Sequence, residues 1–314
     1  MIVVVSDLHL AAYAQGDETR GPEDKESKGD KTRKDDAQFI EFLKYLSSHQ
    51  LQSGGHLVIL GDAVDYWRRG LAGALLDSTG SIDLLRSLKL NQNVGLHYVV
   101  GNHDYYNWNL CSLVKNYYPF DDMDKQVRLN DGGRDFFFIH GHQIEMMVNP
   151  YYNSLEIYES FSEQLCLAGQ YFGVHLAGLW DLFTYCANIF QKIFKRGLPP
   201  DVSKTLESMS KGPEKRLYGE HTTAKSIRNL SEERKTLEEK FGLREDEFLI
   251  FGHTHDPFFS KNAMVINAGS WNKAPCELYL FLQIEEGEPK FKKFENGKCV
   301  DMQIPAQAAG RFVT

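Results

Sequence analysis

The chain has 314 residues, of which 42% are hydrophobic and 25% charged, as is ordinary for a globular protein. The formal net charge of −8 gives no general basic surface for nucleic acid. Five scattered cysteines, none in C-x-x-C spacing, argue against a disulfide framework and against a thiolate zinc site. The chain opens directly on a strand pattern rather than a signal peptide, so we expect a cytoplasmic protein.

Short apolar runs alternate with helix-like stretches along the chain. The expected strands are Ile2–Val5, His56–Leu60, Leu96–Val100, Phe136–Ile139, Phe248–Phe251, Met264–Asn267 and Leu278–Ile284. Between the first two, residues 35–49 predict an amphipathic helix whose apolar face carries Phe39, Phe42, Leu43 and Leu46. The early strand–helix–strand alternation indicates an α/β fold, and the closer spacing of the later strands indicates a second sheet beside the first.

Two segments interrupt this alternation. Gly16–Asp36 is almost wholly charged and has no apolar residue, which predicts a solvated loop. The second, from about Glu145 to Gly242, is helical in pattern and contains the apolar, aromatic stretch Glu163–Phe194. Polar residues within that stretch make a membrane-spanning helix a poor fit. It therefore has three interpretations: a buried helix pair, a lid or dimer surface, or an element that contacts a membrane surface.

The chain's unusual polar residues gather after five of the expected strands. These residues are Asp7 and His9; Asp62 and Asp65; Asn102, His103 and Asp104; His140 and His142; and His253 and His255. Each cluster alone could be a turn or a satisfied core histidine. Five such clusters, all at the carboxyl ends of strands, instead predict one shared site, because these ends meet at the usual ligand-binding edge of an α/β sheet.

The residue types in these clusters indicate metal chemistry. Carboxylates, imidazoles and one amide oxygen suit borderline divalent ions such as Mn, Fe or Zn. Two ions about 3.5–4 Å apart need a bridging carboxylate, clamp both oxygens of a phosphoryl transfer and lower the pKa of bound water. The glycines that precede Asp62, Asn102 and His253 would allow a close approach of backbone and ion.

The order D-x-H, G-D-x-x-D, G-N-H-D, H-G-H and G-H-x-H resembles the calcineurin-like metallophosphoesterase superfamily, with the blocks running from Asp7 to His255. This resemblance implies a mixed α/β (α+β) fold, a four-layer αββα sandwich of two mixed β-sheets flanked by helices. Residues 1–144 and 243–314 would form the phosphoesterase domain. Residues 145–242 would be a helical insertion that serves as a lid or an interface.

The resemblance also implies a role for each candidate site residue. One metal would be held by Asp7, His9, Asp62 and His255, and the other by Asp62, Asn102, His140 and His253. His103 would contact the phosphate and stabilise or protonate the leaving oxygen, with Asp104 orienting its ring. Asp65 would support the site from behind the ligands, His142 has no assigned role, and the assignments of His140 and His142 could be exchanged.

We therefore predict a phosphoester hydrolase that holds two divalent ions, with Mn favoured, and cleaves a phosphodiester or pyrophosphate bond with metal-bound hydroxide. The stretches "SDLHL" and "GDAVDYW" and the long insertion are similar to UDP-diacylglucosamine hydrolases, in which the insertion covers acyl chains. We expect a small-molecule phosphoester or a lipid-linked substrate, and the apolar insertion leaves peripheral membrane contact and a homodimer as open alternatives. Many of those enzymes have Arg at the place of His103. The alternatives are a non-catalytic scaffold of the same fold, a nuclease, which the negative charge disfavours, and a protein phosphatase.

Overall fold

The computed structural model describes residues 1–10, 36–69, 74–75, 78–113, 118–148, 155–167, 229–230, 233–271 and 279–302. The predicted loop at Gly16–Asp36 lies outside these residues except for Asp36. Of the apolar stretch Glu163–Phe194, only residues 163–167 are described, as the end of a helix over residues 155–167.

The described strands form two mixed sheets. The first sheet has the order β12-β11-β10-β1-β2-β3-β4 and the second β5-β6-β7-β9-β8. Strands of the first sheet are β1 (Ile2–Val5), β2 (Gly55–Leu60), β3 (Val94–Val99), β4 (Asp122–Asp124), β10 (Leu280–Glu285), β11 (Glu288–Glu295) and β12 (Lys298–Asp301). Those of the second are β5 (Gln126–Asp131), β6 (Arg134–Ile139), β7 (Phe248–Phe251), β8 (Phe258–Ser260) and β9 (Val265–Asn267).

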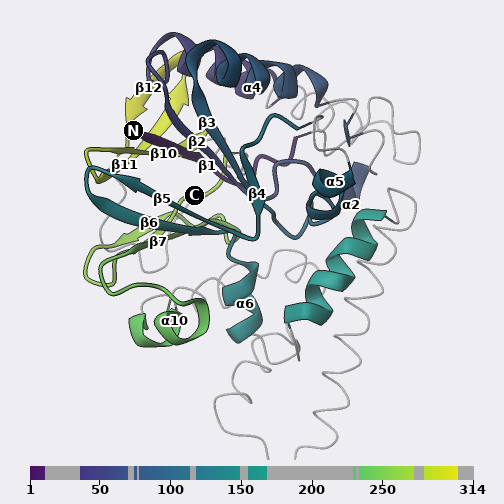
Figure 1. Cartoon of the computed structure of the whole chain (residues 1–314), viewed down its shortest axis with the longest axis vertical. Coiled ribbons are helices and arrows are strands. Elements are labelled where there is room, and N and C mark those ends of the chain that lie inside the picture. The colour runs from purple at the N-terminus through teal and green to yellow at the C-terminus, as the bar shows by residue number, and fades with distance from the viewer. Residues whose placement is uncertain are drawn as a thin grey trace, which may run out of the picture.

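Helices cover the outer face of each sheet, as Figure 1 shows. The first sheet is covered by a helix over residues 36–48 and by α4 (Thr79–Gln92). The second is covered by α6 (His142–Val148) and α10 (Arg234–Phe241), although the latter falls within the segment predicted as an insertion. The shorter helices α2 (Tyr66–Arg69) and α5 (Asn107–Leu113) follow the loops after β2 and β3.

The core is divided into three apolar layers by the alternation of side chains along the strands. Val3 and Val5 of β1 pack outward against the helices, in the same cluster as Phe39 and Phe42. Ile2 and Val4 point the other way, into a cluster shared by both sheets. A third cluster joins the second sheet to Ile144 of α6 and Leu237 of α10. The predicted four-layer αββα sandwich is thus confirmed.

All seven predicted strands are present, with ends that differ from the prediction by at most two residues. Five further strands were not predicted: β4, β5, β8, β11 and β12. They lie at or beside the sheet edges, and most of their residues are at least partly exposed, as in the pattern EPKFKKFE of β11. An edge strand buries too little apolar surface to stand out in a sequence.

Strand pairing brings the loops that carry the predicted clusters to one edge. β1, β2 and β3 are parallel neighbours, and so are β6 and β7. A parallel bridge between Leu10 and Val64 continues the pairing of the first two loops beyond their strands. No helix among the described residues is both long and apolar enough to cross a bilayer.

Candidate metal centre

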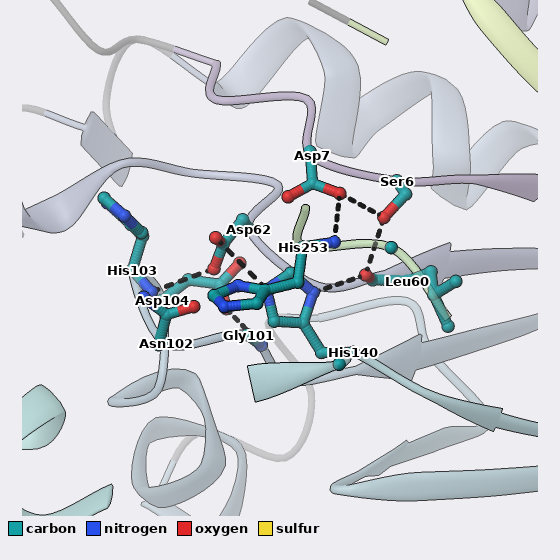
Figure 2. A network of polar contacts seen from close by, with 12 residues as sticks. Ser6, Asp7, Leu60, Asp62, Gly101, Asn102, His103, Asp104, His140 and His253 are labelled. Carbon is teal, nitrogen blue, oxygen red and sulfur yellow. Dashed lines mark hydrogen bonds and ion pairs between the residues drawn. The ribbon is translucent and has the colours of Figure 1, made fainter. Parts of the chain in front are cut away.

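The loop after β1 is fixed by its backbone to the loop after β2. The amide of Asp7 donates to the carbonyl of Gly61 at 3.1 Å, and that of His9 donates to the carbonyl of Asp62 at 2.9 Å. The Asp7 carboxylate accepts a hydrogen bond from the hydroxyl of Ser6 at 2.5 Å and another from the amide of His253 at 3.0 Å. Asp7 is therefore held between both sheets, as Figure 2 shows.

Five of the predicted ligands have a left-handed backbone. Asp7, His9, Asp62, His253 and His255 have φ angles of 52°, 45°, 50°, 66° and 55°. For a residue with a Cβ this conformation costs on the order of 1–3 kcal/mol, and such strain concentrates at functional sites. The fold thus gives up stability to direct these five side chains.

Asp62 is the carboxylate that connects the clusters. Its Oδ1 accepts the backbone amide of His103 at 2.8 Å, and its Oδ2 lies 3.2 Å from Nε2 of His140. Gly101 packs so closely that a Cβ at this position would collide with the carboxylate of Asp62. A Cβ at Gly252 would likewise collide with Ser6, so both positions require glycine for the packing of the neighbouring side chains.

His140 presents the ring nitrogen that a metal ligand requires. Its Nδ1 lies 2.8 Å from the carbonyl oxygen of Leu60, which can only accept, so the neutral ring carries its proton on Nδ1. Nε2 is then left facing Asp62, an arrangement typical of metal-binding histidines. His142 lies beside His140 and His253, with ring centroids 5.6 Å and 6.4 Å away, but its Nε2 is 3.8 Å from Oε1 of Glu159 and its ring packs beside Tyr158. This geometry favours His140 over His142 as the ligand.

Asn102 carries the amide oxygen that was predicted to be a ligand. Its side chain is buried, with 3% of its surface exposed, and among the described residues Oδ1 has no hydrogen-bond partner. A buried polar atom without a partner is rare and calls for an explanation. A divalent ion shared with Asp62 would satisfy it, so the oxygen fits its predicted role.

Three groups of side chains in the described part of the chain are close enough to hold an ion, with ligand atoms within 4.8 Å of one another. They are Asp7, His9 and His255; Asp62, His140 and His253; and His9, Asp65 and His103. The first two contain three of the four ligands predicted for each metal, and their nitrogen and oxygen donors fit borderline divalent ions. The third arises because the carboxylate of Asp65 contacts the rings of both His9 and His103.

The ring of His103 is oriented by Asp65 and Trp67. Nδ1 of His103 lies 3.1 Å from Oδ1 of Asp65, and the ring stacks on the indole of Trp67 with centroids 4.1 Å apart. Asp104 instead accepts the backbone amides of Ala63 at 2.7 Å and Gly101 at 2.8 Å, and the hydroxyl of Tyr98. These contacts give the orienting role to Asp65, not to Asp104 as the sequence predicted, and Asp104 holds the loops together.

The carboxylates and imidazoles of the cluster shift one another's pKa values. Burial alone would raise the pKa of the Asp7 carboxyl, but His255 and His140 outweigh it and lower the pKa to about 2. The Asp62 pKa also falls well below its usual range, because His140 and His103 overcome burial. Burial would lower the pKa of His140, yet Asp62 and Asp7 raise it to about 10. The carboxylates at the centre are thus ionised.

Sequence reasoning missed several residues that shape the site. Trp67 and Ser6 lie within the quoted motifs but carry no signal of their own. Glu145 of α6, with Oε2 2.5 Å from Nε2 of His253, and Cys166, with Sγ 3.4 Å from the carbonyl oxygen of His103, belong to the segment predicted as an insertion. No spacing in the sequence connects them to the clusters, because helical contacts across 60 or more residues leave no local pattern.

An αββα sandwich with imidazoles and carboxylates at the shared strand ends defines a metallophosphoesterase. The chain belongs to the calcineurin-like phosphoesterase family, whose model matches residues 1–257. No match was found among curated proteins.

Similar solved structures are distant in sequence. An archaeal phosphodiesterase is 13% identical with a TM-score of 0.39, covering 93% of this chain and 99% of its own. A dimetal phosphatase from Danio rerio is 12% identical with a TM-score of 0.40, covering 93% and 95%. A predicted phosphoesterase from Streptococcus pneumoniae is 10% identical with a TM-score of 0.33, covering 96% and 95%.

Proposed function

We propose that this phosphoesterase holds two divalent ions and hydrolyses phosphodiester or pyrophosphate bonds. The observation that carries the proposal is the pair of three-residue groups, Asp7–His9–His255 and Asp62–His140–His253, that converge from both sheets. Two divalent ions bound there would neutralise the charge of a phosphate and supply an activated water at neutral pH. We favour Mn²⁺ as the ion, on the strength of the mixed nitrogen and oxygen donors.

The protein's own contribution to the chemistry centres on His103. Asp65 contacts Nδ1 of the ring, and we assign to the opposite nitrogen, Nε2, the contact with a phosphate oxygen or the protonation of the leaving group. Trp67 covers one face of the ring, which limits its rotation. The backbone amide of His103 is bonded to Asp62, so the ring is tied to the carboxylate that both ions would share.

The test compares metal-stripped protein with and without added Mn²⁺ on an aryl phosphodiester and an aryl phosphomonoester. We expect turnover only with the metal and a preference for the diester. Asp62→Ala should be inactive on both. Metal-independent turnover, or full activity of the variant, would overturn the proposal. A monoester preference would favour a phosphatase instead.

A non-catalytic scaffold of the same fold is the main alternative function. A scaffold has no need for an oriented phosphate-contacting ring, whereas His103 is held here by both Asp65 and Trp67. A nuclease would need a basic groove, which the net charge of −8 disfavours. Absence of turnover on every phosphoester, despite bound metal, would support the scaffold.

A lipid-linked substrate, peripheral membrane contact and a homodimer are further proposals that rest on the apolar segment. Deleting residues 168–194 would test them while keeping Leu165 and Cys166, which are buried against the core. A larger loss of activity on a lipid-linked pyrophosphate than on the soluble aryl diester would support a lid. Equal losses would contradict it. Cytoplasmic location is likewise proposed from the sequence and is checked by cell fractionation.

A further inference from the structure

Glu145 of α6 forms a short contact with one of the predicted metal ligands. Its Oε2 lies 2.5 Å from Nε2 of His253, and the two side chains are only 18% and 14% exposed. Glu145 was not among the residues predicted to belong to the site. The contact joins positions 108 residues apart, so it is a product of the fold and not of a local turn.

The contact determines which atom of His253 can meet an ion. A carboxylate accepts a hydrogen bond, so the Nε2 side of the ring serves as the donor to Glu145. Nδ1 is then the nitrogen available to an ion shared with Asp62 and His140, the other members of the same candidate group. Glu145 itself is not a member of that group.

The other metal-facing histidine of the same loop has a different arrangement. Nε2 of His255 lies 3.0 Å from Oδ1 of Asp7, which is itself a candidate ligand. Of these two described histidines, His253 is the one whose Nε2 contacts the carboxylate of α6. The two predicted ions would differ in their dependence on α6.

We propose that Glu145 is a positioning residue for the second metal, the ion held by Asp62, Asn102, His140 and His253. By accepting the Nε2 proton it fixes the tautomer and the orientation of His253 and increases the basicity of Nδ1. This proposal rests on the proposed dinuclear function. It also makes α6, the first element after the H-G-H block, a link between the segment at 145–242 and the affinity of one metal site.

The experiment is a calorimetric titration of the metal-free full-length protein with Mn²⁺, comparing wild type, Glu145→Gln and Glu156→Gln. The glutamine keeps the size of the side chain but weakens it as an acceptor, so the fold should be retained. Glu156 is an exposed residue of the helix over 155–167 and gives the same change in charge on a solvent-exposed side chain. We expect Glu145→Gln to weaken one of two binding steps by about 10- to 100-fold and to leave the other unchanged. Glu156→Gln should match wild type.

A double variant separates positioning from a general effect on the fold. His253→Ala removes the ligand, so adding Glu145→Gln to it should cause no further loss of Mn²⁺ affinity. Wild-type affinity at both steps in Glu145→Gln, or equal weakening of both, would overturn the inference. An additional loss in the double variant would also overturn it. If wild type itself binds no Mn²⁺, the proposed function fails, which is a distinct result.

Discussion

Asp65 lies between two histidines with different expected roles. Its Oδ1 is 3.1 Å from Nδ1 of His103, and its Oδ2 is 3.3 Å from Nδ1 of His9. The side chain of Asp65 is fully buried. One carboxylate therefore orients both a predicted metal ligand and the ring predicted to contact the phosphate. A substitution at Asp65 should therefore first change the orientation of the His9 and His103 rings.

Asp65→Asn should lower kcat on an aryl phosphodiester by about 100-fold, which is within the usual contribution of a positioned acid or base. The amide oxygen is a weaker acceptor for the Nδ1 proton than a carboxylate, and the amide nitrogen can only donate, so the ring of His103 is held less firmly in its orientation and its preferred tautomer. Steady-state kinetics at saturating Mn²⁺ measures the effect. His103→Ala is the partner variant: in its background Asp65→Asn should cost much less. Fully additive losses would contradict a shared role.

The second prediction concerns metal removal and stability. Ions that bind only the folded protein stabilise it, by about 2.7 kcal/mol for one site at a free concentration of 100 times Kd. We expect Mn²⁺ to raise Tm by about 5 °C over the protein treated with chelator. Asp62→Ala should show no such rise, because it removes the carboxylate common to both predicted sites. Thermal denaturation measures Tm. An equal rise in Tm in wild type and in the variant would indicate that Mn²⁺ binds elsewhere.

Much of this site could be predicted from the sequence because its ligands follow buried strands directly. The apolar runs predicted the strands, and the polar residues directly after them predicted where the candidate ligands lie. These residues include Asp7, Asp62, Asn102, His140 and His253. The orientation of His103 could not be predicted. Asp65 and Asp104 are both acidic residues near it in the motifs, and only the packing of three loops decides between them. The Glu145 contact was hidden for the same reason, since it depends on how α6 leaves the second sheet.

The third prediction uses a pair of glycines. Gly101→Ala should lower the free energy of unfolding by about 1–3 kcal/mol and weaken Mn²⁺ binding, because the new methyl group collides with the carboxylate of Asp62. Gly80→Ala is the matched control. Gly80 lies in the first turn of α4, where a Cβ would only touch Cδ1 of Ile40 at 3.6 Å. Alanine there should stabilise the protein by about 0.4–1 kcal/mol. Urea denaturation measures both, and similar effects at the two positions would refute the steric argument.

The last prediction tests what holds the second sheet together away from the metal centre. Nε of Arg128 on β5 donates to Glu247 at 2.9 Å, and the side chain of Glu247 is fully buried. Arg128→Ala leaves that carboxylate without its main partner and also removes a guanidinium stacked 4.1 Å above the ring of Phe137. We expect it to cost about 1–3 kcal/mol in urea denaturation, because the buried carboxylate of Glu247 loses a hydrogen-bond donor, while solvent already screens the partly exposed guanidinium. Arg244→Ala is the control, because its pair with Asp135, at 3.1 Å, is solvent-exposed and should contribute less than about 1 kcal/mol. Equal losses in the two variants would show that burial of Glu247 does not set the strength of this contact.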